Sequence, residues 1–225
     1  MKWWLRAYGV AVRLVNARLL EAAVVVALLV AIAGPASAES ARPRLLALGD
    51  SLTAGFGLPE DQAFPTRLQA WLNRAGVEVT VINAGVSGDT SAGGLARLDW
   101  ALGNDPPEFA LVELGANDAL RGLSPGALYD NLDKIISRLQ AKRVKVLLAG
   151  MYAPRNYGSD YDKEFDAVYP RLAKAHGVPL YAFFLDGVAG DPALNQADGL
   201  HPNPRGVDVI VDRLGPEVVK LIKGE

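Results

Sequence analysis

The sequence contains no cysteine and only two histidines among its 225 residues. Without cysteine, the protein can form no disulfide, no thiolate zinc site, no iron–sulfur cluster and no cysteine nucleophile. The histidines, His176 and His201, are far apart in the sequence, and a metal site usually needs several clustered ligands. We therefore expect no bound metal and no cofactor. A dinucleotide is not expected either, because Gly55 and Gly57 lack the third glycine of the usual fingerprint.

The chain also has little net charge and no long run of basic residues. Its formal charge is -2, with 23 lysines and arginines against 25 aspartates and glutamates. Proteins that bind nucleic acids usually carry a basic patch, so we expect no nucleic-acid partner. Hydrophobic residues make up 50% of the chain and charged residues 21%, which excludes a disordered chain and provides enough apolar material for one ordinary domain.

Residues 1–38 have the pattern of a secretory signal. A basic leader precedes an unbroken apolar run at residues 22–33, a Gly-Pro pair ends the run, and Ala-Ser-Ala at residues 36–38 matches a small-residue cleavage site. The run is shorter than the ~20 residues that a membrane-spanning helix needs. We therefore expect cleavage after Ala38, a periplasmic or secreted protein, and no stable membrane insertion after cleavage. Because the leader is long and carries further apolar residues, an uncleaved anchor remains the alternative.

The remaining residues, 39–225, show no linker and no internal repeat, so we expect a single domain. Short apolar runs alternate with helical patterns along this part of the chain. The runs are continuous, which is typical of parallel strands that are buried on both faces. The predicted strands comprise residues 45–48, 77–82, 109–114, 145–149 and 179–183.

Three helices are predicted with particular clarity. Ser124 followed by Pro125 is a typical helix start, since serine caps the first turn and proline fits its first position. Apolar residues at helical spacing continue this helix, and two further helices are expected at residues 163–176 and 207–222. The alternation of strands and helices predicts a doubly wound α/β fold, in which helices cover both faces of one parallel sheet.

Polar and glycine-rich clusters follow the first three predicted strands. They comprise residues 49–52, 83–90 and 115–118, and a fourth cluster at residues 198–202 precedes the last predicted helix. Because the carboxyl ends of parallel strands meet at one edge of a sheet, we expect the first three clusters to lie close together there. Each cluster taken alone could be an ordinary turn or helix cap.

Together, the clusters supply the groups that acyl transfer to a serine requires. Ser51 provides a hydroxyl at a tight turn, and a serine hydroxyl needs a base to remove its proton. His201 can be that base, and Asp198, three residues earlier, can hold the imidazole in the required tautomer. The backbone N–H groups of Ser51 and Gly88 and the side-chain amide of Asn117 are candidate donors to the oxyanion.

These four clusters, in this order, resemble the sequence blocks of the SGNH hydrolases of the GDSL type. Ser51, Gly88, Asn117 and His201 match the four residues that give the family its name. Within the family, the chain is most similar to the periplasmic group that contains thioesterase I, lysophospholipase L1 and arylesterases. The resemblance covers nearly all of the chain after the signal segment and continues through residues 94–98, 112–115 and 156–158.

The resemblance implies a three-layer α/β/α sandwich of flavodoxin-like topology with a five-stranded parallel sheet, in agreement with the strand count above. It also implies a serine ester or thioester hydrolase that acts through an acyl-enzyme on Ser51, without a cofactor. In that mechanism His201 is the base, Asp198 orients it, and Gly88 and Asn117 complete the oxyanion hole with the N–H of Ser51. The implied substrates are small acyl esters and thioesters, such as acyl-CoA, aryl esters and lysophospholipids.

Further residues bear on the choice of substrate. Residues 119–124 match a mobile loop of the family beside the acyl-binding groove, and we expect Leu120, Leu123 and Tyr157 to contact the substrate there. Their apolar surfaces favour an acyl chain over the alternative of an acetylated cell-envelope carbohydrate. A third possibility is a non-catalytic exported domain that binds a small ligand. Phe56 occupies a position where many members of the family have tyrosine.

The other polar residues of the clusters are expected to be structural. Asp50, Asp89 and Asp118 are predicted to accept backbone N–H groups and so to hold the turns together. His176 ends a predicted helix before Gly177, where a cation is favourable for the helix dipole. We expect the protein to act as a monomer on a small-molecule substrate.

Overall fold

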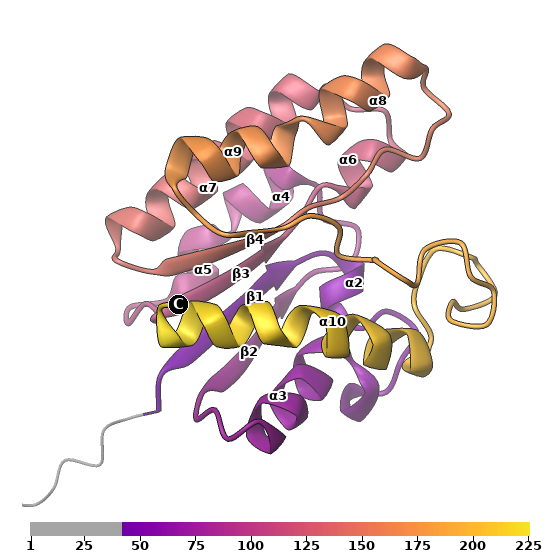
Figure 1. Ribbon diagram of the computed structural model, residues 1–225. Coiled ribbons are helices and arrows are strands. Elements are labelled where there is room, and N and C mark those ends of the chain that lie inside the picture. The colour runs from indigo at the N-terminus through magenta and orange to yellow at the C-terminus, as the bar shows by residue number, and fades with distance from the viewer. Residues whose placement is uncertain (1–41) are drawn as a thin grey trace, which may run out of the picture. The chain divides into compact units, whose positions relative to one another are not determined.

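A sheet of five parallel strands forms the centre of the fold, as Figure 1 shows. The computed structural model describes residues 42–225, so the predicted signal segment and its cleavage site after Ala38 lie outside the described residues. The strands are β1 (Arg44–Gly49), β2 (Thr80–Gly85), β3 (Phe109–Glu113), β4 (Lys145–Ala149) and β5 (Leu180–Tyr181). Their order in the sheet is β2-β1-β3-β4-β5, which confirms the predicted five-stranded parallel sheet.

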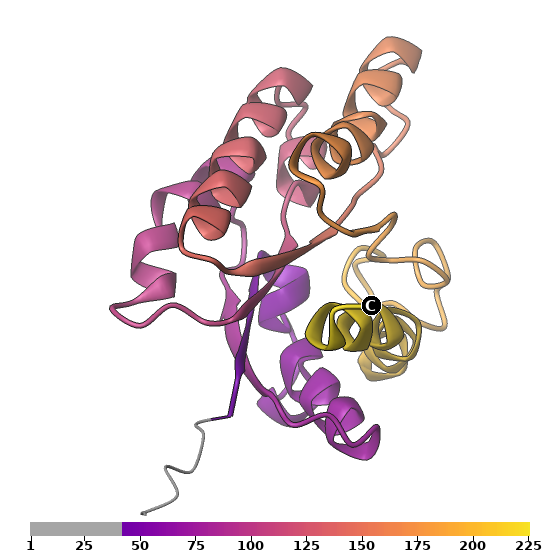
Figure 2. The ribbon, with the colours of Figure 1, turned by 60° about the vertical axis from the view of Figure 1, so that its left-hand side comes forward.

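Helices cover both faces of this sheet. They are α2 (Ser51–Ala54), α3 (Phe64–Arg74), α4 (Ser91–Ala96), α5 (Leu98–Leu102), α6 (Ala116–Leu120), α7 (Pro125–Ala141), α8 (Ser159–Asp166), α9 (Val168–His176) and α10 (Pro204–Lys223), with a 3₁₀ turn η1 (Glu60–Gln62). One face carries α3 and α10, which pack against each other, and the other carries α4, α5, α7 and α9 (Figures 1 and 2). This arrangement confirms the predicted three-layer α/β/α fold.

The inner strands β1 and β3 are buried on both faces, as their continuous apolar sequences predict. Leu45, Leu46 and Leu48 are at most 1% exposed, and all five residues of β3 are buried. Burying a leucine side chain contributes roughly 1.5–3 kcal/mol, so these strands are firmly anchored. In the edge strand β2, by contrast, only Ala84 is buried. No helix within residues 42–225 is both long and apolar enough to cross a membrane.

Two strands, β2 and β5, differ from the predicted ones by more than one residue at an end. β2 begins at Thr80 instead of residue 77, because the N–H of Val77 is bound to the carbonyl of Leu72 at the end of α3. β5 contains two residues instead of the predicted 179–183. Its last residue, Tyr181, pairs with Ala149 at the end of β4, so the chain beyond it has no strand to pair with.

Two helices also differ from the prediction. The helix expected at residues 163–176 is divided into α8 and α9, since Pro170 has no N–H to donate to the carbonyl of Asp166. The last helix begins at Pro204 instead of residue 207, because the side chain of Asn203 accepts two N–H groups of its first turn at 3.0 and 3.1 Å. The predicted helix start after Ser124 is confirmed.

His176 connects two helices and lies away from the polar clusters. It is the last residue of α9, and its Nε2 lies 2.8 Å from Asp133 Oδ1 on α7. Its carbonyl accepts the side-chain amide of Gln140, also on α7, at 3.0 Å. These contacts agree with the structural role that its position at a helix end predicts.

Candidate active site

Ser51 lies at the sharp turn where β1 ends and the four-residue helix α2 begins. Asp50 caps this helix, because its Oδ1 accepts the N–H of Leu52 at 2.9 Å. The helix packs directly on the strand ends: a Cβ at Gly49 would lie 2.1 Å from a side chain of α2, and one at Gly85 would lie 2.3 Å from its backbone. The two glycines therefore let α2 approach the sheet and place the Ser51 hydroxyl at its carboxyl edge.

His201 lies between Ser51 and Asp198. Its Nε2 is 2.9 Å from Ser51 Oγ, and its Nδ1 is 2.6 Å from Asp198 Oδ2. The other oxygen of Asp198 accepts the backbone N–H groups of His201 and Leu200 at 3.0 and 2.9 Å. These two backbone bonds, and then the imidazole, lower the pKa of Asp198 to about 2. The carboxylate is therefore ionised at neutral pH and can hold the imidazole proton on Nδ1, which leaves Nε2 free to accept the hydroxyl proton.

Asn117 and Gly88 line the same pocket as Ser51. Asn117 lies in the first turn of α6, directly after β3, and Gly88 lies in the loop after β2 with a φ of 85°. The Asn117 Nδ2 donates to Asp50 Oδ2 at 3.1 Å and to the carbonyl of Asp89 at 2.9 Å. Both protons of the amide are thus engaged, which orients its nitrogen in the site.

Two buried carboxyl groups lie beneath this turn. Burial raises the pKa of Asp50 to about 6, although the N–H of Leu52 and the amide of Asn117 lower it. Glu113 is fully buried at the end of β3, where its Oε2 accepts the Thr53 hydroxyl at 2.7 Å and the Asp50 N–H at 3.4 Å. Burial and then the charge of Asp50 raise the pKa of Glu113 well above its ordinary value. Sequence analysis missed Glu113, although a glutamate inside an apolar strand was a signal for it.

The aspartates of the clusters follow the prediction in part. Besides the Asp50 cap described above, Asp118 accepts the N–H of Ser91 at 2.7 Å and its hydroxyl at 2.6 Å. For Asp89 the prediction was wrong. Its carboxylate binds Arg97 Nε at 2.5 Å, because the side chain of Arg97 is only 16% exposed and its charge needs an anionic partner.

Two arginines that sequence analysis missed support the loops of the site. Arg97 Nη2 donates to the carbonyl of Gly49 at 2.9 Å and so joins the end of β1 to the cluster after β2. Arg121 Nη2 donates to the carbonyl of Gly88 at 2.8 Å. Both arginines lie in segments that match the family, residues 94–98 and 119–124, but neither arginine was given a role and no local pattern indicated these contacts.

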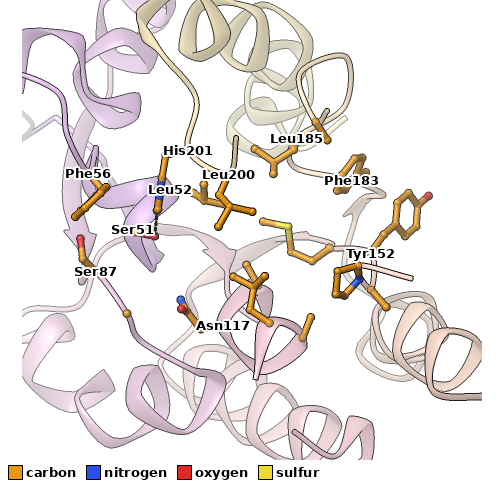
Figure 3. Close-up of a pocket in the computed structure, with 18 residues that line it drawn as sticks. Ser51, Leu52, Phe56, Ser87, Asn117, Tyr152, Phe183, Leu185, Leu200 and His201 are labelled. Atoms are coloured by element: carbon orange, nitrogen blue, oxygen red, sulfur yellow. Dashed lines mark hydrogen bonds between the residues drawn. The ribbon is translucent and has the colours of Figure 1, made fainter. Parts of the chain in front are cut away.

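An apolar pocket of about 400 Å³ extends from Ser51 and His201. In Figure 3, Tyr152 and Phe183 lie at the end of the pocket away from Ser51 and His201. Sequence analysis did not predict most of the residues that line this pocket. Several of them follow strands β4 and β5 and so lie at the same carboxyl edge of the sheet as Ser51. The main apolar side chains are Leu120, Met151, Tyr152, Phe183, Leu185 and Leu200.

The three residues predicted to contact the substrate differ in their relation to this pocket. Leu120 lines the pocket, but Leu123 and Tyr157 do not. The Tyr157 hydroxyl donates to the carbonyl of Leu120 at 2.9 Å, and the Tyr161 hydroxyl donates to that of Leu123 at 3.0 Å. Both tyrosines therefore brace the loop after α6.

Phe56 packs against His201. Its ring centroid lies 4.6 Å from that of His201, with the rings tilted by 38°. Phe56 also lines the pocket and is 49% exposed, so it covers one side of the imidazole at the pocket mouth. An aromatic ring is sufficient for this contact, and a tyrosine hydroxyl is not required.

The fold and this site define the class of the protein. A hydroxyl, an imidazole and a carboxylate form one hydrogen-bonded chain beside amide donors and an apolar pocket, which is the arrangement of a serine hydrolase. Across the described range 42–225, no three histidine, aspartate or glutamate side chains are grouped so that they could hold a metal ion.

Comparison with known proteins gives the particular family. The sequence pattern of the GDSL-like lipase/acylhydrolase family matches residues 47–209. Arylesterase of Vibrio mimicus is 41% identical over 184 residues, which cover 82% of this chain and 92% of that protein. Thioesterase 1/protease 1/lysophospholipase L1 of Escherichia coli strain K12 is 40% identical, with coverage of 81% and 86%. The crystal structure of TesA, 40% identical, superposes with a TM-score of 0.75 over 79% of this chain and 99% of that one.

The chain therefore belongs to the GDSL-like lipase/acylhydrolase family and is a carboxylic ester hydrolase. This result confirms the family that the four sequence blocks indicated, together with its fold.

Proposed function

We propose that this protein is an exported serine esterase that cleaves carboxylic esters and thioesters through an acyl-enzyme on Ser51. The observation that carries the proposal is the chain of hydrogen bonds from Asp198 through His201 to Ser51, with distances of 2.6 and 2.9 Å, at the mouth of an apolar pocket. A hydroxyl bound to a neutral imidazole is an activated nucleophile, and the pocket can take the apolar part of an ester.

In the proposed first step, His201 Nε2 removes the proton of the Ser51 hydroxyl while Oγ attacks the carbonyl carbon of the substrate. The ionised Asp198 stabilises the imidazolium that forms. His201 then gives this proton to the departing alcohol or thiol as the C–O or C–S bond breaks, which leaves Ser51 acylated. Water attacks the acyl-enzyme with His201 again as the base, and the carboxylic acid and free Ser51 are released.

The carbonyl oxygen becomes negatively charged during both attacks. We assign the N–H groups of Ser51 and Gly88 and the amide of Asn117 as its donors. Because Asp50 and Asp89 already accept both protons of the amide, Asn117 must share one of these protons with the oxyanion. The two acceptors hold the amide in place before the substrate arrives, so little reorganisation is needed as the charge develops.

The lining of the pocket favours an acyl or aryl group as the bound part of the substrate. Met151, Phe183 and Leu185 offer apolar contacts, whereas a glycan would need several polar partners. The names of the relatives, arylesterase and thioesterase 1/protease 1/lysophospholipase L1, support aryl esters, thioesters and lysophospholipids as candidates. An acetylated cell-envelope carbohydrate is the substrate class that this lining favours least.

A panel of substrates tests the proposal. The purified protein is assayed on p-nitrophenyl acetate and octanoate, octanoyl-CoA, lysophosphatidylcholine and acetylated xylan. We expect octanoyl esters and thioesters to be cleaved faster than acetylated xylan, and Ser51→Ala to lose roughly 10⁴-fold or more in kcat. Ser159→Ala, at the start of α8, is the matched control and should keep full activity. Retention of most activity by pure Ser51→Ala would refute the mechanism, and highest activity on acetylated xylan would establish a deacetylase.

We also propose that residues 1–38 direct export and are removed after Ala38. The basic leader, the short apolar run and the small residues before the site support this proposal. It is tested by expressing the full chain in a bacterial host and sequencing the N-terminus of the exported protein. A mature N-terminus at Glu39 is expected. A protein that keeps Met1 and remains with the membrane fraction would instead establish an uncleaved anchor.

A further inference from the structure

The base and its aspartate lie on an irregular segment, residues 182–203, which connects β5 to α10 (Figure 1). Two asparagines close this segment on itself. Asn195 Nδ2 donates to two of its carbonyl groups at 2.7 and 2.8 Å, and Asn203 Nδ2 donates to a third at 2.9 Å. These bonds define the internal shape of the segment, but they do not set its distance from Ser51.

Gln196 joins this segment to the turn that carries the nucleophile. Its Nε2 donates to the carbonyl of Phe56 at 2.7 Å and to that of Pro202 at 3.0 Å. Its backbone N–H donates to the carbonyl of His201 at 2.7 Å. Gly57 provides the space for this side chain, since a Cβ at that position would lie 2.2 Å from Gln196 Oε1.

These bonds complete a ring of four residues. Phe56 donates its N–H to the carbonyl of Ser51 at 3.0 Å, Gln196 joins Phe56 to His201, and the imidazole returns to the Ser51 hydroxyl at 2.9 Å. Within the part of the chain that the structure describes, only two side-chain hydrogen bonds link residues 182–203 to the turn of the nucleophile. One is the bond between His201 and Ser51, and the other is that of Gln196.

We propose that Gln196 is a positioning residue of the esterase reaction, which sets the separation between His201 Nε2 and Ser51 Oγ. The inference rests on the proposed function of these two residues. Gln196 does not line the substrate pocket, so it acts through the base and not on the substrate. Its loss lets the segment move relative to the nucleophile, and an error of about 1 Å in such geometry can cost roughly 100-fold in rate.

The first test is kinetic. Gln196→Met keeps the length of the side chain and removes its hydrogen bonds, and we expect kcat to fall roughly 10- to 100-fold with KM unchanged. Gln69→Met is the matched control. Gln69 also bridges two segments, since its side chain donates to the carbonyl of Val79 at 2.9 Å and accepts the N–H of Val81 at 2.8 Å. It lies away from the pocket, so its loss should reduce stability and leave kcat unchanged.

The second test asks whether Gln196 acts through His201. The effect of Gln196→Met is measured again in a His201→Ala background, where no imidazole remains to be positioned. We expect no further loss of the residual activity there, because residues that act as a unit are not additive. If Gln196→Met fails to fold, Gln196→Asn, which keeps the amide but is one methylene shorter, serves for the same comparison.

The third test uses the two histidines of the chain. In the ¹⁵N spectrum of an untagged protein, Gln196→Met should shift the imidazole signals of His201 and leave those of His176 unchanged, and His176→Gln assigns them. An unchanged kcat, a loss of the same size in the His201→Ala background, or equal shifts of both histidines would overturn the inference. Failure of the proposed function is distinguishable, because only then does Ser51→Ala retain activity.

Discussion

The two halves of the site are held in different ways. The half that carries Ser51 and Asn117 follows the ends of two inner strands, and the carboxyl groups of Asp50 and Glu113 beneath it are buried. The half that carries the proposed base, His201, lies on the irregular segment 182–203, and the side chains of Asp198 and His201 remain 38% and 20% exposed. The first half is thus part of the protein interior, whereas the second is a surface segment held beside it.

Because of this difference, substitutions in the two halves should have different effects on rate and on stability. A buried polar group that loses its partner costs roughly 1–3 kcal/mol, so changes in the strand-end half should reduce both rate and stability. An exposed ion pair contributes about 0–1 kcal/mol, so changes in the segment half should reduce rate alone. The predictions below test this division, from the largest expected effect to the smallest.

Asp198→Asn should give the largest loss of rate with little loss of stability. An asparagine cannot hold the imidazole proton on Nδ1 as a carboxylate does, so we expect kcat to fall roughly 10³- to 10⁴-fold. The free energy of unfolding in urea should change by less than about 1 kcal/mol. Asp186→Asn is the control, because Asp186 lies in the same segment and pairs with Arg213 at the surface. A loss of stability much larger than that of the control would contradict the expectation that changes in the segment half reduce rate alone.

Asn117→Ala should reduce rate and stability together. Loss of an oxyanion donor typically costs 10²- to 10³-fold, roughly, in kcat. The same change removes the donor to Asp50 Oδ2 and leaves only the N–H of Leu52 on this buried carboxyl group, so we expect roughly 1–3 kcal/mol less stability and a still higher pKa of Asp50. Esterase kinetics and urea unfolding of the same preparations provide the two readouts. An unchanged unfolding midpoint would show that the buried carboxyl group does not depend on this amide.

The strand-end half could largely be predicted from the sequence. Parallel strands buried on both faces require continuous apolar runs, and the position of each run determines which polar residues reach the carboxyl edge of the sheet. Ser51, Gly88 and Asn117 therefore came together in the prediction before any contact was known. The ends of strands and helices were predicted less accurately, because individual backbone hydrogen bonds decide them. The bond from the N–H of Val77 to the carbonyl of Leu72 is an example.

The contacts that support the site could not be predicted in this way. Glu113, Arg97 and Gln196 act across 48 to 140 positions of sequence, through bonds that depend on the final path of the backbone. Local patterns report which face of a strand or helix is buried, but not which distant carbonyl a side chain will meet. For the same reason Tyr157 was expected in the pocket, although its hydroxyl fastens the loop from outside.

Gly49→Ala should reduce stability by overpacking the strand-end half. The added methyl would lie 2.1 Å from Thr53 Oγ1 and 2.6 Å from Glu113 Oε2, so α2 or the glutamate must move. We expect a loss of roughly 1–3 kcal/mol in urea unfolding, as overpacked cores show. Gly126→Ala is the control, because its Cβ would meet only Ser124 Oγ at 3.4 Å, and it should stabilise α7 by roughly 0.5–1 kcal/mol.

The buried carboxyl groups should also make stability depend on pH. The folded protein raises the pKa of Glu113, and that of Asp50 to about 6, so it holds these protons more tightly than the unfolded chain does. Their contribution to stability is present below their ordinary pKa values of ~4 and is lost as the pH rises through the folded values. Asp198 acts in the opposite direction, but only between about pH 4 and 2, because its pKa is lowered to about 2.

Glu113→Gln separates these contributions, since glutamine has a similar shape and does not titrate. We expect the wild-type protein to be less stable in urea at pH 8 than at pH 5, and the variant to show a smaller difference between the two. Glu108→Gln, in the loop before β3, is the matched control and should leave the difference unchanged. A wild-type difference that survives undiminished in Glu113→Gln would mean that Glu113 does not contribute to it, and would leave Asp50 as its source.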